Sequence, residues 1–273
     1  MDTELTERFR KLDFRDDFMF KKVMEDPVLC REVMECLLQH PVGKIRAVST
    51  EKEFRYTSNG KPVRMDIFNQ NSEGDVFDVE MQNRNKKAVQ ALHLPQRIRF
   101  YQASIDIDYL NRNNNYEKLP KSSILFICTF DPFQWGLSQY HFAECCIEEP
   151  RIRLGDGTVK VFFNCRYEGN DIPDDLKKFY DYVMKGTAES DLTRKIEAAV
   201  VKGRRNERWR TQYMKELVMI QDAKSEERKR MMVLLRKEKK LRATEKKRAD
   251  TAEKRADAAE KRIKELEAQL AGK

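Results

Sequence analysis

The sequence predicts a mixed α/β domain followed by a long helical extension. Segments with helical periodicity alternate with segments of strand periodicity as far as about residue 185. Beyond residue 190 the pattern is helical throughout. We therefore expect a globular domain over residues 1–188, a basic helical region over residues 189–221 and a C-terminal coiled coil over residues 222–273.

The domain is organised around residues 62–83, PVRMDIFNQNSEGDVFDVEMQN. Apolar and polar residues alternate on both sides of the turn-forming NSEG segment, which predicts two strands joined as a hairpin. Successive side chains of a strand point to opposite faces, so one face is expected to be core and the other acidic. The acidic face carries Asp66 on the first strand and Asp78, Glu80 and Gln82 on the second.

The same pattern predicts the register of the hairpin. All apolar residues face the core only when paired positions sum to an even number, which requires a loop centred on Glu73. A loop of two or four residues would place half of the apolar residues in water. The expected register therefore sets Asp66 directly opposite Glu80.

Two opposed carboxylates repel each other, and fold stability alone gives little reason for that arrangement. A divalent cation removes the repulsion, because Mg²⁺ is held by one or two carboxylates together with substrate phosphate and water. Such an ion activates water and neutralises charge on a phosphodiester. The alternative is an amphipathic hairpin whose acids are solvated or paired with Arg64 and Arg84, and alternation alone does not separate the two interpretations.

Four segments carry more specific information: DFMFK at residues 17–21, the strand that contains Asp66, EMQN at residues 80–83 and RIRFY at residues 97–101. Together they resemble the PD-(D/E)XK nuclease superfamily, and in particular its transposase branch, the recombination-promoting nuclease (Rpn-like) group. The resemblance extends over about residues 12–185, and EMQN is its most specific part. It implies a restriction-endonuclease-like α/β core and a role in transposition or recombination.

The resemblance also implies site residues. Asp66 and Glu80, with the carbonyl of Met81, would hold Mg²⁺ or Mn²⁺. Gln82 stands where the superfamily's signature lysine is usual, and it would position the attacking water by hydrogen bonding, because glutamine is not a base at neutral pH. Position 65 is Met rather than the proline of the superfamily's name. The residues expected to contact DNA are Arg84, Arg97 and Tyr101.

Two helices are expected within residues 16–39, with a break at Pro27 and with Asp13 as the N-cap of the first. In the resembled fold the first helix can lend an acid to the metal site. Asp17 and Glu32 are the candidates for that role, and capping or surface charge is the alternative explanation for each.

A further helix is expected to begin near Pro95 and to end at about Leu110. Arg97 and Tyr101 are four residues apart and therefore lie on one face of it. In the resembled fold this helix crosses behind the active strand, where Arg97 reaches a phosphate or Glu80. The alternative is an arginine stem packed on the tyrosine ring.

The remaining segments complete a mixed sheet. Phe133, Trp135 and Leu137 are expected to cover its core. The predicted elements are a strand or loop over residues 42–56, a turn at residues 58–60, a buried strand over residues 121–130, a hairpin that pairs residues 140–147 with residues 159–165 around a tip at residues 155–157, and a helix over residues 174–184 that ends at Gly186.

The basic surplus lies in the tail. Residues 200–273 hold 24 Lys and Arg against 13 Asp and Glu, whereas the first 199 residues are slightly acidic. Four arginines surround Trp209 and are the best nucleic-acid candidate of the tail, although a solvated face is the commoner explanation of a charge run. Apolar residues recur at intervals of three and four from Ala249 to Leu270, which predicts a coiled coil and a homo-oligomer, with a lone solvated helix as the alternative.

Composition excludes several classes of protein. Charged residues make up 37% of the chain, and no apolar run approaches the ~20 residues needed to cross a bilayer. The N-terminus lacks a secretory pattern, so a cytoplasmic location with six reduced, mostly buried cysteines is expected. The sequence contains no phosphate loop and no dinucleotide turn, so no nucleotide cofactor is expected.

The sequence thus predicts a Mg²⁺- or Mn²⁺-dependent DNA endonuclease that hydrolyses phosphodiester bonds. The alternative is a catalytically degenerate nuclease fold that acts as a DNA-binding or oligomeric interaction module. Replacement of the signature lysine by Gln82 and the modest basicity of the tail leave that alternative open.

Overall fold

The computed structural model describes residues 2–54, 63–83, 93–113 and 115–271. The chain divides into two compact units, Met1–Thr211 and Gln212–Lys273. The first unit contains the sheet and its covering helices. The second unit is helical, and the proposed boundaries at residues 188 and 221 stay a prediction.

The described helices are α1 (Asp2–Arg10), α2 (Asp17–Met24), α3 (Pro27–Leu38), α4 (Leu94–Asn113), the short 3₁₀ helix η2 (Tyr116–Lys118), α5 (Asp174–Lys185), α6 (Asp191–Arg204) and α7 (Glu207–Ala271). The strands are β1 (Ile45–Phe54), β2 (Val63–Asn71), β3 (Val76–Gln82), β4 (Ser122–Cys128), β5 (Gln139–Phe142) and β6 (Thr158–Asn164). This composition confirms the predicted mixed α/β fold with a helical extension.

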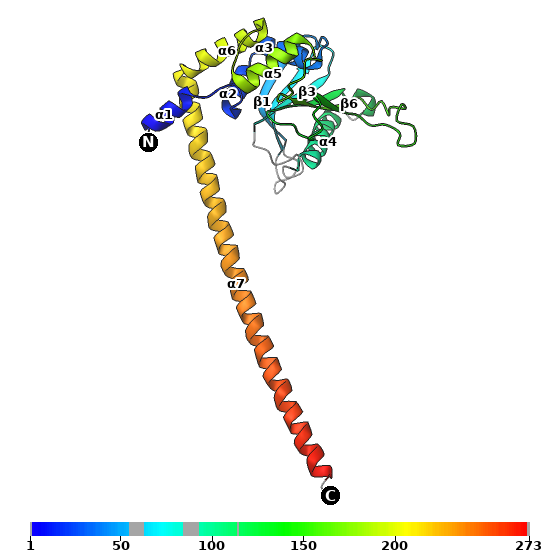
Figure 1. Cartoon of the computed structure of the whole chain (residues 1–273), viewed down its shortest axis with the longest axis vertical. Coiled ribbons are helices and arrows are strands. Elements are labelled where there is room, and N and C mark those ends of the chain that lie inside the picture. Colours follow the sequence, from blue (N-terminus) through cyan, green and yellow to red (C-terminus); the bar gives the residue numbers. More distant parts are fainter. Residues whose placement is uncertain (1, 55–62, 84–92, 114, 272–273) are drawn as a thin grey trace. The chain divides into compact units, whose positions relative to one another are not determined.

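The strands form one six-stranded mixed sheet in the order β1-β2-β3-β4-β6-β5. The pairs β1–β2, β2–β3 and β5–β6 are antiparallel, whereas β3–β4 and β4–β6 are parallel. Helix α4 lies on one side of the sheet, and α2, α3 and α5 lie on the other (Figure 1). Parallel central strands require covered faces, and the helices on both sides provide that cover.

The register of the β2–β3 hairpin is the one that the apolar pattern predicts. Ile67 pairs with Val79 and Asn69 with Phe77, so the paired positions are centred on Glu73. The loop is closed by a hydrogen bond of 3.0 Å from the Asn71 amide to the Asp75 carbonyl. Asp66 and Glu80 consequently project to the same face of the sheet.

The alternative interpretation, an amphipathic hairpin with solvated acids, is contradicted by the burial of β3. All seven residues of β3 are buried, because β3 lies in the interior of the sheet between β2 and β4. Helix α4 covers the face that carries the acids and packs Ile98, Tyr101 and Ile105 into the core on that side. The carboxylates therefore lie in a largely dry environment.

The N-terminal helices differ from the prediction in two details. Helix α1 was not expected, and the N-cap position of α2 is Asp16 rather than Asp13, with no capping hydrogen bond from the Asp16 side chain. Asp13 lies in the turn between α1 and α2, where its carboxylate accepts hydrogen bonds from the Arg15 amide at 2.8 Å and from the Arg15 guanidinium. Helix α3 begins at Pro27, as predicted, and the Asp26 side chain caps it.

The second hairpin also needs correction. Gln139 pairs with Phe163 and Tyr140 with Phe162, so its centre lies near Arg151 and not at the glycines of residues 155–157. Those glycines lead directly into β6. Phe133 packs against the core, but Trp135 and Leu137 are 82% and 53% exposed and do not cover it.

The other predicted elements agree with the structure within a few residues. Strands β1 and β4 lie inside their expected ranges, α4 begins one residue before Pro95 and extends to Asn113, and Gly186 ends α5 with a φ of 78°. The expected turn at residues 58–60 lies outside the described residues.

The cysteines and the long helix complete the description. All six thiols are free; four are buried, Cys146 is intermediate and Cys145 is exposed. Several apolar residues of α7 are exposed in the single chain, among them Leu234 and Ile263 at 60% and 54%. None of the described helices has an apolar stretch long enough to span a bilayer.

Candidate active site

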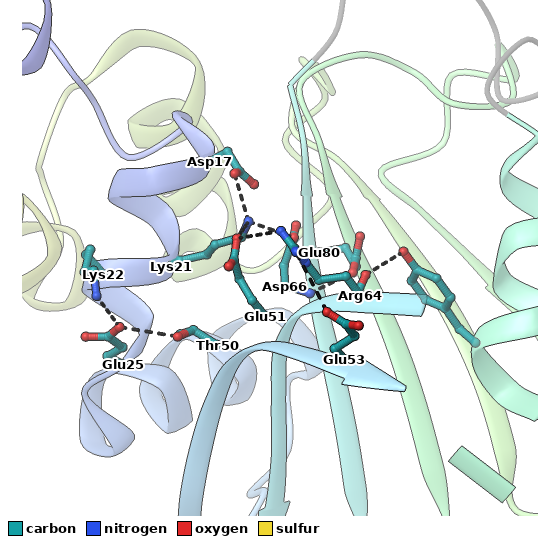
Figure 2. Close-up of polar contacts among 11 residues, drawn as sticks. Asp17, Lys21, Lys22, Glu25, Thr50, Glu51, Glu53, Arg64, Asp66 and Glu80 are labelled. Atoms are coloured by element: carbon teal, nitrogen blue, oxygen red, sulfur yellow. Dashed lines mark hydrogen bonds and ion pairs between the residues drawn. The ribbon is translucent and has the colours of Figure 1, made fainter. Parts of the chain in front are cut away.

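Five elements bring charged side chains together at the end of the β2–β3 hairpin that lies away from its turn. Helix α2 contributes Lys21, β1 contributes Glu51, β2 contributes Asp66, β3 contributes Glu80 and α4 contributes Arg97. Figure 2 shows most of this cluster, with Lys21 directed from its helix towards the strands. The cluster therefore depends on the tertiary fold and not on any single segment.

The two predicted acids meet directly. The backbone amide of Asp66 donates a hydrogen bond of 3.0 Å to Oε1 of Glu80. Glu80 is only 1% exposed, and the side chain of Asp66 is 15% exposed. The register derived from the apolar pattern thus brings both carboxylates to one place.

Lys21 is a site residue that the sequence analysis missed. Its ammonium group lies 2.8 Å from Asp17, 3.0 Å from Glu51 and 3.3 Å from Asp66 (Figure 2). Burial lowers the pKa of Lys21, but the charges of Asp66 and Asp17 outweigh burial and hold the pKa above its ordinary value. Lys21 therefore stays charged. The only sequence signal was its position in the DFMFK segment.

Arg97 satisfies both interpretations that the sequence left open. Its Nη2 donates to Oε2 of Glu80 at 2.6 Å, and its guanidinium carbon lies 5.2 Å from the centre of the Tyr101 ring. Its Nε also donates to the Tyr101 hydroxyl at 2.9 Å, and that hydroxyl donates to the Arg64 carbonyl at 3.1 Å. Tyr101 thus fixes the orientation of Arg97.

The environment raises the pKa of Asp66, Glu80 and Asp78. Burial raises the pKa of Asp66 despite the opposing effect of Lys21. Burial and the charge of Asp66 together raise the pKa of Glu80 to about 8, despite Arg97. Asp78 has no hydrogen-bond partner on either carboxylate oxygen, and burial followed by the charge of Glu80 raises its pKa well above the usual range. Such groups favour a bound cation.

A cavity of about 560 Å³ opens beside this cluster. Its lining comprises Arg15, Asp16, Asp17, Asp66, Met81, Gln82, Asn83 and Arg97. Four predicted site residues therefore line one cavity: Asp66, Met81, Gln82 and Arg97. Glu80 and Tyr101 do not line it, but both contact Arg97. Asp17 belongs to the lining, whereas Glu32 lies elsewhere and pairs with Lys195 at 3.0 Å.

One of the two expected partners of the acids pairs elsewhere. Arg64 approaches Glu51 and Glu53 at 3.7 and 4.0 Å. It therefore does not neutralise the hairpin acids in the way that the alternative interpretation supposed. Arg84 lies outside the described residues.

The donor atoms suit a hard cation. The Asp66 carboxylate and the side-chain amides of Gln82 and Asn83 belong to residues that line the cavity. Glu80 does not line it, and its carboxylate accepts hydrogen bonds from the Asp66 amide and from Arg97. Among the described residues no group of three or more His, Cys, Asp or Glu side chains is arranged as a metal cage. Mg²⁺ and Mn²⁺ fit such a site, because they bind through one or two carboxylates and keep several waters. Zinc, which favours nitrogen and sulfur ligands, does not fit it.

Comparison with known proteins identifies the family of this chain. The model of the PD-(D/E)XK nuclease family transposase matches residues 14–152. No curated protein and no solved structure gave a significant match. The matched range covers half of the chain and includes Lys21, Asp66, Glu80 and Arg97. The chain therefore belongs to the PD-(D/E)XK nuclease family transposases.

Proposed function

We propose that this protein is a Mg²⁺- or Mn²⁺-dependent endonuclease that hydrolyses phosphodiester bonds of DNA during transposition or recombination. The observation that carries the proposal is the meeting of Asp66 and Glu80 beside one cavity, with the cations of Lys21 and Arg97 on either side. Membership of the nuclease family supports the reaction class and DNA as the substrate.

The metal would be held by Asp66, Glu80 and the carbonyl of Met81. When bound, it supplies charge neutralisation and an activated water. Gln82, which is 7% exposed and lines the cavity, holds the attacking water through its amide. Because an amide takes no proton at neutral pH, the proton passes to solvent or substrate.

Lys21 supplies the cation that Gln82 does not. It approaches Asp66 at 3.3 Å, stays protonated, opposes the effect of burial on the pKa of Asp66 and orients its carboxylate towards the proposed metal position. It reaches the site from α2 and not from β3. Its role is that of a positioning residue.

Arg97 and Arg84 are proposed to contact DNA. The side chain of Arg97 is about one-third exposed at the cavity, where its guanidinium would pair with a DNA phosphate. Tyr101 is 5% exposed and serves DNA binding through its hydrogen bond to Arg97.

A plasmid assay tests the proposal. The parent chain is expected to nick supercoiled DNA with Mg²⁺ or Mn²⁺ and to be inactive with EDTA. Asp66→Asn and Glu80→Gln preserve shape and should lower the rate at least about a hundredfold, because each removes a carboxylate ligand. Equal background cleavage by the parent and both variants would contradict a nuclease function.

The competing function is a degenerate nuclease fold used as a DNA-binding or interaction module. It is favoured by the two ion pairs, Lys21–Asp66 and Arg97–Glu80, which neutralise the carboxylates without a metal. Calorimetric titration with Mn²⁺ separates the two functions. Binding in the parent that Asp66→Asn abolishes supports the enzyme, whereas no binding together with intact DNA affinity supports the module.

We further propose that the C-terminal helix mediates self-association as a coiled coil and that the protein works in the cytoplasm. Exposed apolar residues of α7, including Ile263, support the first point. Sedimentation of the full chain is expected to show a dimer or larger oligomer, and Ile263→Lys should shift it towards the monomer. A parent that sediments as a monomer at micromolar concentration would contradict self-association.

A further inference from the structure

The cavity at the candidate active site is the first of three that share lining residues. It shares Arg15 with a second cavity of about 160 Å³, which lies between the α1–α2 turn and α5. The second shares Arg204 with a third cavity of about 500 Å³. The three cavities therefore form a series on the first unit of the chain, in which each neighbouring pair shares one arginine.

The character of the lining changes along this series. The site cavity is lined by three aspartates and two arginines. The third cavity is lined by four arginines and one glutamate, and it lies where α1, the end of α6 and the start of α7 meet. Its arginines are Arg10, Arg204, Arg205 and Arg210. Acidic groups thus dominate at one end and basic groups at the other.

The packing of the α6–α7 turn holds this third cavity in shape. A side chain at Gly203 would come within 2.4 Å of the Trp209 ring, so the indole packs closely on the glycine. The Nε of Arg204 donates to the Leu12 carbonyl at 2.7 Å and joins the α1–α2 turn to α6. Trp209 therefore acts as a packing residue here, and the nearby arginines form the binding surface.

We propose that DNA continues from the candidate active site past Arg15 and Arg204, and that the arginine-lined cavity binds a phosphate of the same DNA backbone. This inference rests on the proposed function, since it assumes that DNA occupies the site cavity. Guanidinium groups bind phosphate through paired hydrogen bonds. Contacts of this kind position the duplex without reading its sequence.

The test measures DNA binding without cleavage. A labelled duplex is titrated with the full-length protein in EDTA at 50 to 200 mM salt, with the double variant Arg10→Gln/Arg205→Gln and the parent side by side. Both arginines are exposed and neither contacts Asp66 or Glu80. The double variant is expected to bind about tenfold more weakly and to lose about one to two units of the slope of log K against log salt, because two phosphate contacts disappear.

A matched control carries the same change of charge elsewhere. Arg151→Gln/Arg153→Gln removes two exposed arginines from the β5–β6 hairpin, and it should bind within about twofold of the parent. Equal weakening of both double variants would overturn the proposal, because net charge alone would explain it. Parental affinity in the Arg10/Arg205 variant would overturn it as well.

Duplex length separates a continuous path from an isolated anion site. The affinity of both proteins should rise with duplex length and then level off. For the parent it should level off at a longer duplex than for the Arg10/Arg205 variant. An identical length dependence, or selective loss of binding to inorganic phosphate with DNA binding unchanged, would identify a site for free anions and overturn the proposal. This test needs no metal, so it can be interpreted even if the protein does not cleave DNA. If the parent cleaves DNA but the Arg10/Arg205 variant binds DNA as tightly as the parent, the DNA path is refuted and the nuclease function is not.

Discussion

Two arginine–glutamate pairs in this protein have the same separation and opposite surroundings. Arg97 and Glu80 lie 2.6 Å apart beneath α4, with Glu80 only 1% exposed. Arg242 and Glu238 lie 2.6 Å apart on α7, with side chains 75% and 51% exposed. The distance is equal, so the difference between the pairs comes from desolvation.

Desolvation changes what a charge pair does. On α7 water screens both charges, and the pair contributes about 0.3–0.5 kcal/mol to stability. Beneath α4 the Glu80 carboxylate has lost nearly all of its water, so removal of Arg97 leaves a buried acid without its cation.

Lys21→Met should have the largest effect. Lys21 is 8% exposed and contacts three carboxylates, so its loss leaves Asp66 buried without its cation. We expect the free energy of unfolding to fall by about 3 kcal/mol at pH 7, measured by urea denaturation. Lys229→Met, which removes an exposed lysine paired with Glu226, is the control and should change it by less than about 0.5 kcal/mol. Similar losses in both variants would refute the contrast.

Arg97→Met should come next. The methionine keeps much of the packing against Tyr101 but removes the cation and the hydrogen bond to the tyrosine hydroxyl. We expect a loss of about 2 kcal/mol, less than for Lys21 because the Arg97 side chain is 37% exposed. The same denaturation experiment measures it. A loss below that of an exposed pair would show that Glu80 is already neutral and needs no partner.

Asp78→Asn should stabilise the protein, and the gain should grow with pH. Burial raises the pKa of Asp78 in the folded chain. At pH values between the pKa of the unfolded chain and the pKa of the folded chain, Asp78 is therefore protonated in the folded state and ionised in the unfolded state. Stability of the parent therefore falls as pH rises through this window, by up to about 1.4 kcal/mol per pH unit from this group. Asparagine removes this contribution. Denaturation at pH 5, 6 and 7 checks it, and parallel curves for the two proteins would contradict it.

Arg242→Met should have the smallest effect and is the counterpart of Arg97→Met. The pair with Glu238 is exposed on both sides, so the free energy of unfolding should change by less than about 0.5 kcal/mol. A shift of the helical signal at 222 nm larger than the experimental scatter would show that α7 depends on this pair.

Local pattern was sufficient where the physical constraint was itself local. The alternation in residues 63–82 determined the strands, their register and the shared face of Asp66 and Glu80, because a shift of one residue would move the odd-numbered apolar side chains of one strand to the face opposite those of its partner. The four-residue spacing of Arg97 and Tyr101 determined their common helical face. The proline at residue 27 determined where α3 begins.

Only the tertiary structure decided how far the acids of the site are buried and which cations contact them. The burial of Glu80 and Asp78 depends on α4 packing over β3, and alternation in a strand does not specify what covers each face. Lys21 is 45 residues from Asp66 in the sequence and meets it through the packing of α2 against the sheet. The arginine-lined cavity likewise joins Arg10 to Arg205 across most of the first unit. Pairing within a segment follows from its own periodicity, whereas desolvation and long-range charge contacts arise only when separate elements pack together.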